Sequence, residues 1–560
     1  MMMAQNKKLE IIATSDIHGA LFPVDFVSGK DHLPSMSQIN TYVKMQRHQS
    51  DREILLLDNG DYLQGDPAVY YYNYIDTSAV HIGAKIMNYM QYDGSCAGNH
   101  DFEAGRDVFE KFVKALNFPC MAANVIDEKT GQTLLPAYTI YKRAGKTIAV
   151  IALTTPGIPN WLPDKLIYDL EFEDMIKSAK YWMPIILEKE KPDLVIGLCH
   201  AGTDYTFNNQ TDTTYKNENA ALLTAKQVEG FDIIIAGHDH IGHNFTITNK
   251  WGKEVTIIAP TARARDFCSI EVNFTPYGND IKTHIYTTAS LPADYSFIHN
   301  FEHEIKIIKD FFNEPIGIIS KSISAIEGIF KADPLTNLIH KVQLEVTDAE
   351  ISFAAPLSMN SNIHKGMQYR KDLFKLYKYD NSLYAIEMSG KEIKDMLEFS
   401  YWQWFNKMKD EDDYLLRYKT DSVGNITSQT FPDTYTPAYN YESAAGIIYT
   451  VDVSKDKGER INIKSMSNGE PFDYEKIYKV AINSYRGTGG GGHLTLGAGI
   501  PEKELFQRIT FVSQQDMKFY IAQWLKNNSP VEIDKNENWK IIPEKWYKKA
   551  LKKEYKMFSL

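Results

Sequence analysis

The chain has 560 residues, which is too long for one hydrophobic core, so we expect two or more domains. Its 43% hydrophobic and 24% charged residues are ordinary for a soluble globular protein. A net charge of −11 argues against a nucleic-acid polymer as the main partner, because backbone binding needs a basic face. A local metal centre would still attract small anions.

The amino terminus carries no targeting segment that we can recognise. "MMMAQNKKLE" lacks a basic stretch followed by an apolar one, which predicts no signal peptide. The chain is then either cytoplasmic or an exported protein written without its signal. No run approaches the roughly 18 apolar residues of a membrane helix, so no membrane span is expected. The four cysteines show no metal-binding or disulfide spacing, which predicts buried small apolar residues.

The first half of the chain alternates short apolar runs with longer helical stretches. The strand-like runs are "LEIIATS" (9–15), "REILLLDNG" (52–60), "TIAVIALT" (147–154), "PDLVIGLCH" (192–200) and "FDIIIAGHD" (231–239). Amphipathic stretches such as "FEDMIKSAKYWMPIILEKEKP" (172–192) separate them. Strands that alternate with helices predict an α/β architecture.

The second half begins with a charged amphipathic stretch, "FIHNFEHEIKIIKDFFNEP" (297–315), which predicts a helix connecting two domains. New helix and strand patterns follow, then a polar, tyrosine-rich stretch over 400–445 and the glycine run "RGTGGGGH" (486–493). The end, "EKWYKKALKKEYKMFSL" (544–560), is basic and could be helical; we expect a solvated surface tail there.

Four of the predicted strands lead into side chains that bind metals, and the glycine-bracketed turn "AGNHDFEAG" (97–105) adds an asparagine and a histidine. Each motif alone is an ordinary loop or core feature. Loops at the carboxyl ends of strands are where α/β folds build sites, so we expect these side chains to converge. The candidate metal ligands are Asp16, His18, Asp61, Asn99, His200, His238 and His240.

These seven side chains form a ligand set for two divalent metal ions, with Asp61 as the natural bridge. Mixed imidazole and oxygen ligation suits zinc, manganese, iron or cobalt better than magnesium. Two such ions roughly 3.5–4 Å apart activate a hydroxide and stabilise an in-line displacement at phosphorus. This chemistry needs no serine or cysteine nucleophile.

The series "SDIHG", "NGDYLQG", "GNHDFEAG", "CHAG" and "GHDH" resembles the signature of the calcineurin-like metallophosphoesterases. The resemblance implies a four-layer αββα catalytic domain over residues 8–294 with two divalent transition-metal ions. It also implies that His100 faces the phosphate, where it stabilises the transition state or protonates the leaving oxygen. Glu103 stands where relatives have Asp or Asn and is the expected partner that orients His100.

The later segments resemble the 5'-nucleotidase branch of that family, which implies a linker helix over 295–322 and an α+β substrate-binding domain over 323–545. In "KYDNSLY", Tyr379 and Asn381 match a base-stacking aromatic residue and its neighbouring asparagine. In "NSYRGTGGGGH", Tyr485 matches the second aromatic residue, and Arg486 is a further substrate-binding candidate. A base held between two rings gains roughly 1–3 kcal/mol from stacking.

Two departures favour the group that hydrolyses 2',3'-cyclic nucleotides and 3'-nucleotides. The segment "LSMNSN" (357–362) lacks the arginine of 5'-nucleotidases, and Gly491 replaces their aspartate. The expected substrates are therefore cyclic and 3'-nucleotides. The alternatives are a 5'-nucleotidase or UDP-sugar hydrolase and, remotely, a surface protein that binds nucleotides without hydrolysing them. The resemblance further implies a periplasmic or cell-surface protein, and a monomer is favoured.

Overall fold

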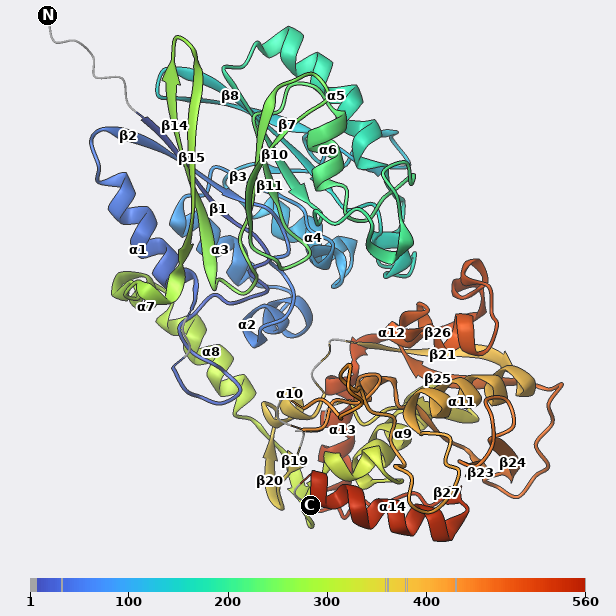
Figure 1. Ribbon diagram of the computed structural model, residues 1–560. Coiled ribbons are helices and arrows are strands. Elements are labelled where there is room, and N and C mark those ends of the chain that lie inside the picture. The colour runs from blue at the N-terminus through green and yellow to red at the C-terminus, as the bar shows by residue number, and fades with distance from the viewer. Residues whose placement is uncertain are drawn as a thin grey trace, which may run out of the picture. The chain divides into compact units, whose positions relative to one another are not determined.

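Contacts between residues divide the chain of this computed structural model into two units, residues 1–310 and 311–560 (Figure 1). The structure describes residues 8–31, 34–357, 359, 362–377, 379, 381–428 and 431–558. Three residues of the "LSMNSN" segment, Ser358, Asn360 and Ser361, lie outside the described residues.

Two six-stranded sheets packed face to face form the centre of the first unit (Figure 1). The first sheet has the order β15-β14-β1-β2-β3-β4, with bounds Gly278–Thr287, Asp266–Thr275, Lys8–Thr14, Arg52–Asp58, Gly94–Cys96 and Cys120–Met121. The second has the order β12-β13-β11-β10-β8-β7, with bounds His243–Thr248, Glu254–Ala259, Ile233–Ala236, Leu194–His200, Lys146–Thr154 and Tyr138–Arg143. A small third sheet joins β5 (Val125–Asp127), β6 (Gln132–Thr133) and β9 (Leu170–Phe172).

Apolar side chains from the inner faces of the two large sheets, among them Ile11, Leu57, Val150 and Ile196, fill the space between them. Helix α1 (Met36–Arg47) lies against β2, and α3 (Ile82–Met90) contacts α4 (Arg106–Lys114). Helices α5 (Met175–Glu190) and α6 (Ala221–Gln227) lie against β8, β11 and β13 of the second sheet. The predicted four-layer α/β architecture is confirmed.

Strands β1, β2, β3 and β4 run parallel, and so do β8, β10, β11 and β13 in the other sheet. Parallel strands of one sheet place their carboxyl ends at the same edge. The predicted ligands lie in the loops after β1, β2, β3 and β11 and at the last residue of β10, so the topology brings distant segments of sequence together.

The second unit contains a five-stranded sheet of order β22-β18-β25-β21-β26, with bounds Ser443–Ala445, Ile351–Ala354, Ile477–Asn483, Ser382–Ser389 and Ile509–Asp516. A three-stranded sheet joins β24 (Ile461–Met466), β23 (Ile447–Asp452) and β27 (Trp539–Ile542). Two short pairs are β16–β20 (Pro315–Ile319, Gly366–Tyr369) and β17–β19 (Ile323–Ser324, Asn362–Ile363). The main helices are α9 (Pro334–Thr347), α10 (Asp372–Leu376), α11 (Gly390–Trp404) and α13 (Met517–Asn528), which gives the expected α+β arrangement.

Helices α7 (Tyr295–Asn300) and α8 (Glu302–Phe312) occupy the segment for which a connecting helix was predicted over 295–322, and β16 begins at Pro315. The carboxyl-terminal helix α14 (Glu544–Met557) corrects the expectation of a solvated tail. Ala550 and Glu554 on one face of α14 are fully buried, because this face packs on the core of the second unit.

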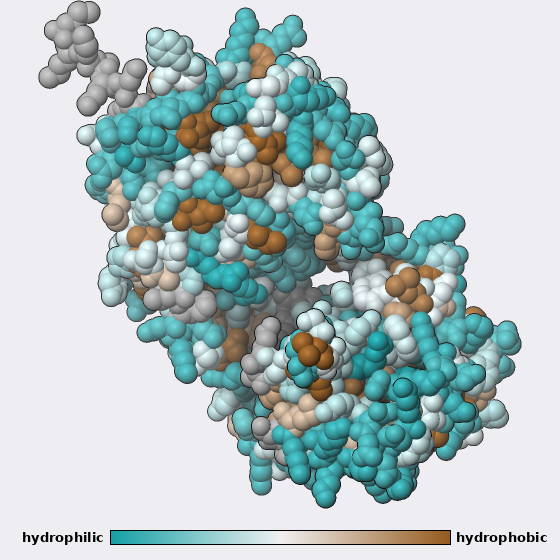
Figure 2. Space-filling view, viewed as in Figure 1, coloured by the Kyte–Doolittle hydropathy of each residue, from teal (hydrophilic) through white to brown (hydrophobic). Residues whose placement is uncertain are grey.

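Hydrophilic residues dominate the face of the molecule that Figure 2 shows, with apolar residues scattered among them. Within the described residues, no helix combines the length and apolar character needed to cross a membrane. All four cysteines are buried and form no disulfide, as their spacing predicted.

Candidate metal centre and base-binding cavity

Five of the seven predicted ligands have a left-handed backbone conformation, with φ of 54° at Asp16, 48° at His18, 59° at Asp61, 74° at His238 and 58° at His240. Non-glycine residues rarely adopt this conformation, although Asp and His tolerate it better than most. Strained positions of this kind cluster at functional sites. Here they form the sharp turns that directly follow β1, β2 and β11.

The structure brings Asp16, His18, Asp61 and His240 together, with one ligand atom of each within 4.8 Å of the others. Nε2 of His18 lies 2.9 Å from Nε2 of His240 and 3.9 Å from Oδ2 of Asp61. Nε2 of His240 lies 3.4 Å from Oδ1 of Asp16. Two imidazole nitrogens and two carboxylates thus point at one small volume, as donors around a shared cation do.

A second group of donors consists of Asp61, His200 and His238. Nε2 of His200 lies 3.1 Å from Oδ2 of Asp61. The side-chain oxygen of Asn99 lies 3.0 Å from Nε2 of His200 and 2.8 Å from Nδ1 of His238, so the predicted asparagine joins this group. Asp61 belongs to both groups, which is the position a bridging carboxylate requires.

Asp61 also provides the test of whether these residues fit a metal pair. Its Oδ2 atom is buried and makes no hydrogen bond of good geometry, although His200 lies close. Burial alone would raise the pKa of Asp61, yet the charges of His200 and His100 hold it well below its usual value. A buried carboxylate oxygen without a hydrogen-bond partner costs free energy unless a cation binds it. The seven side chains therefore fit two divalent transition-metal ions.

The second ring nitrogen of three candidate ligands is held by a neighbouring polar group. Gln64 Oε1 lies 2.9 Å from Nδ1 of His18, and the Asn59 carbonyl lies 2.7 Å from Nδ1 of His200. Glu218 Oε1 lies 3.4 Å from Nε2 of His238. Such partners fix the orientation and tautomer of a metal-binding histidine. The sequence did not single out these three partners, although Asn59 and Gln64 belong to the same motif as Asp61.

Asp101 is a further residue that the sequence analysis missed. Its buried carboxylate accepts hydrogen bonds from four backbone N–H groups: Asp61 (3.1 Å), Tyr62 (2.8 Å), Leu63 (2.9 Å) and Gly98 (2.8 Å). One side chain thus ties the loop after β2 to the loop after β3. The signal available in the sequence was its place directly after Asn99 and His100.

The two loops approach so closely that glycine is required at their contact. A Cβ atom on Gly98 would lie 2.2 Å from the backbone nitrogen of Asp61. A Cβ atom on Gly60 would lie 2.5 Å from the nitrogen of Gly98. Both distances are far below van der Waals contact. These glycines let the turn that carries Asn99 and His100 sit against the bridging aspartate.

His100 lies at the edge of this cluster. Its backbone N–H donates to Oδ1 of Asp61 at 2.8 Å, and its Nδ1 lies 2.6 Å from Oε1 of Glu103. Burial alone would lower the pKa of His100, but the charges of Glu103 and Asp61 outweigh it and raise the pKa to about 10. Bound cations would lower it from there. With Nδ1 occupied by Glu103, Nε2 is the nitrogen available to a substrate.

The predicted base-binding residues lie in the second unit, where Tyr379, Asn381 and Tyr485 line one cavity of about 200 Å³. The other lining residues are Leu357, Tyr439 and Asn483. Arg486 is only 1% exposed, and its guanidinium donates to Oε1 of Glu442 at 3.0 Å. Its position favours an indirect contribution to this cavity over a direct contact with substrate.

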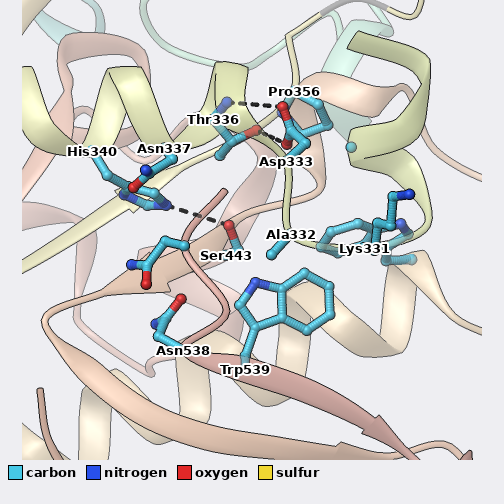
Figure 3. Close-up of a pocket in the computed structure, with 13 residues that line it drawn as sticks. Lys331, Ala332, Asp333, Thr336, Asn337, His340, Pro356, Ser443, Asn538 and Trp539 are labelled. Carbon is cyan, nitrogen blue, oxygen red and sulfur yellow. Dashed lines mark hydrogen bonds between the residues drawn. The ribbon is translucent and has the colours of Figure 1, made fainter. Parts of the chain in front are cut away.

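A second cavity in this unit, shown in Figure 3, measures about 10 Å³, which is room for about one water molecule. Several of its polar groups are already paired with one another. The Thr336 hydroxyl donates to Asp333 at 2.5 Å, and Nε2 of His340 lies 3.4 Å from the Ser443 hydroxyl. Burial lowers the pKa of His340 to about 3. This cavity is too small for a nucleotide and contributes to packing.

Comparison with known proteins decides the family. Residues 9–242 match the family described as calcineurin-like phosphoesterase, and residues 315–497 match the 5'-nucleotidase C-terminal domain. The chain is a calcineurin-like phosphoesterase with a 5'-nucleotidase C-terminal domain. It is therefore a hydrolase of phosphoester bonds. The candidate metal ligands all lie in the first matched region, and the predicted base-binding residues in the second.

One similar protein is the trifunctional nucleotide phosphoesterase protein YfkN of Bacillus subtilis (strain 168), which is 25% identical over 602 aligned positions. The alignment covers 96% of this chain but only 39% of that protein. The 2',3'-cyclic-nucleotide 2'-phosphodiesterase/3'-nucleotidase of Yersinia enterocolitica is 24% identical. The alignment covers 95% of this chain and 88% of that protein. A crystal structure of a putative 5'-nucleotidase from Staphylococcus aureus, in complex with alpha-ketoglutarate, has a TM-score of 0.74 and 23% identity, and covers 96% of this chain and 100% of that one. The last similarity shows a shared fold.

Proposed function

We propose that this phosphoesterase hydrolyses nucleotides, and that 2',3'-cyclic nucleotides and 3'-nucleotides are its main substrates. The observation that carries the proposal is the pairing of two features in one chain. The first unit holds a complete set of donors for two metal ions, and the second holds a tyrosine-lined cavity of a size suited to a base. The names of the relatives in Bacillus and Yersinia support the substrate class.

The glycine run supports the choice of cyclic and 3'-nucleotides over 5'-nucleotides. Gly491 has φ of 68°, and a Cβ atom there would lie 2.4 Å from Nη1 of Arg486 and 2.6 Å from Oδ1 of Asn440. An aspartate at this position, as expected in a 5'-nucleotidase, would require both neighbours to move. The name of the matched carboxyl-terminal domain keeps 5'-nucleotide hydrolysis as the second candidate.

In the proposed reaction, two divalent metal ions would be held by seven side chains: Asp16, His18, Asp61, Asn99, His200, His238 and His240. When bound, such ions would supply an activated nucleophile and polarise the phosphoryl oxygens. Nε2 of His100 donates a proton to the leaving oxygen or a hydrogen bond to a phosphoryl oxygen. Glu103 accepts from Nδ1, which keeps the ring oriented and favours its protonated form. The rings of Tyr379 and Tyr485 bind the base.

The family resemblance extends the proposal to a protein that acts outside the cytoplasm, in nucleotide salvage. The test of the activity itself is a chromatographic time course with 2',3'-cyclic AMP, 3'-AMP and 5'-AMP, each with manganese, with zinc and with EDTA. We expect cyclic AMP to give 3'-AMP and then adenosine and phosphate, only when metal is present. Turnover mainly of 5'-AMP would replace the proposed specificity by the second candidate. No turnover of any nucleotide would refute the nucleotide assignment.

A further inference from the structure

The cavity of the second unit is bounded by three tyrosines that come from separate parts of the chain. Tyr379 precedes β21, Tyr485 lies in the short helix α12 (Ser484–Gly487), and Tyr439 lies in a single turn over Ala438–Asn440. Tyr379 and Tyr485 are 39% and 42% exposed, so their rings are accessible to a ligand. Tyr439 comes from the tyrosine-rich stretch to which the sequence assigned no role.

Tyr439 stands nearly at right angles to both other rings. Its centroid lies 6.0 Å from that of Tyr379 at an interplanar angle of 80°, and 6.2 Å from that of Tyr485 at 89°. Rings that hold a flat group between them at contact distance are roughly 7–8 Å apart. The midpoint between them then lies about 5 Å from the Tyr439 centroid, within the range of edge-to-face pairs. A base at this midpoint would contact all three rings.

Arg486, which follows Tyr485 in the chain, also holds Tyr439 in position. Nη2 of Arg486 donates to the Tyr439 carbonyl at 3.1 Å, and its Nε donates to Glu442 at 3.0 Å. The guanidinium carbon lies 5.4 Å from the centre of the Tyr485 ring. One buried cation therefore joins the two segments that carry these rings, so the third wall of the cavity is preorganised.

Asn483 adds a polar group of known orientation to the same cavity. Its side-chain oxygen accepts a hydrogen bond from the backbone N–H of Arg486 at 2.8 Å and caps α12. The amide nitrogen of Asn483 is then the end that can serve a ligand, and it can only donate. The cavity thus combines aromatic surfaces with a fixed hydrogen-bond donor.

We propose that Tyr439 is a third base-contacting residue of this chain, and that Asn483 donates a hydrogen bond to an acceptor of the bound nucleoside. This inference rests on the proposed function, because it assigns further residues to the same nucleotide site. It selects ligands that have a flat aromatic ring and an acceptor at its edge or on its ribose. A sugar phosphate without a base would gain nothing from these two residues.

The test is calorimetric binding of adenosine to the full chain, together with hydrolysis of 3'-AMP and of glycerol 2-phosphate, a phosphate ester without any ring. We expect Tyr439→Ala to weaken adenosine binding about tenfold and to lower kcat/KM for 3'-AMP more than for glycerol 2-phosphate. Asn483→Asp keeps a capping oxygen but replaces the donor by an acceptor, and should weaken adenosine binding severalfold. The control is Tyr435→Ala, since Tyr435 is exposed on the same segment and packs 3.9 Å from the Arg417 guanidinium, outside the cavity lining.

Four results distinguish this inference from the proposed activity. Wild-type affinity for adenosine in Tyr439→Ala, or an equal loss in Tyr435→Ala, would overturn the role of Tyr439. A chain that does not bind adenosine at all would overturn it as well. Tyr439-dependent binding of adenosine without hydrolysis of any nucleotide would support the inference and remove the proposed activity.

Discussion

Replacing Asp101 by asparagine tests whether one buried carboxylate sets the geometry of the metal centre. In the wild type, Oδ1 accepts from the N–H groups of Tyr62 and Leu63, and Oδ2 accepts from those of Asp61 and Gly98. An amide of the same shape presents an NH₂ group to one of these pairs, so two hydrogen bonds are lost. Each hydrogen bond to a charged group contributes about 1.5–3 kcal/mol. We therefore expect Asp101→Asn to destabilise the first unit by about 3 kcal/mol.

The same substitution should weaken metal binding, because the loop that positions Asp61 loses its anchor. Loss of an outer-shell partner typically costs about 10–100-fold in metal affinity. Urea unfolding of the chelated protein and calorimetric titration with manganese measure the two effects. Asp107→Asn, which makes the same chemical change at an exposed aspartate of α4, is the control. Asp101 is not the anchor we describe if the variant keeps a manganese affinity within threefold of wild type and a free energy of unfolding within about 0.5 kcal/mol of wild type.

His100→Asn should lower kcat by about 10²–10⁴-fold at unchanged bound metal, because only the side chain of His100 is removed from the reaction; loss of metal would contradict this role. EDTA should abolish hydrolysis and destabilise the first unit, because metal at 100 times its Kd adds about 2.7 kcal/mol to the free energy of unfolding. Equal melting curves with and without metal would refute the candidate centre. Burial raises the pKa of Glu554 from 4.5 to about 7, so the folded state binds this proton more tightly than the unfolded state does. The protonated carboxyl stabilises the folded state fully below pH 4.5, and roughly 3 kcal/mol of stability is lost as pH rises through 7. Glu554→Gln should therefore flatten the dependence of the free energy of unfolding in urea on pH. An unchanged pH dependence in this variant would contradict the shifted pKa. Arg486→Ala leaves Glu442 buried without its partner and should lower the free energy of unfolding of the second unit by about 3–5 kcal/mol. Unchanged manganese affinity is the control. An unchanged free energy of unfolding would show that the ion pair is not needed for stability.

The convergence of the candidate ligands could be predicted because each follows directly on a strand, and parallel strands end at one edge of a sheet. Asp101 could not be assigned in this way, since three of its four partners are backbone groups of a loop some 40 residues earlier, whose approach the sequence does not encode locally. Tyr439 lies in a segment without helix or strand periodicity, so no pattern singled it out. Helix α14 was misjudged because its many lysines conceal the single buried face that carries Glu554.

The left-handed backbone at five of the candidate ligands affects how mutagenesis of this centre should be read. Aspartate, asparagine and histidine enter that conformation more readily than alanine, for which it costs roughly 1–2 kcal/mol. An alanine scan of Asp16, His18, Asp61, His238 and His240 would therefore confound the loss of a donor with a change in the shape of its turn. Asparagine at each of these positions preserves the turn and replaces the carboxylate or imidazole donor by an amide, so its effect can be attributed to the change of donor.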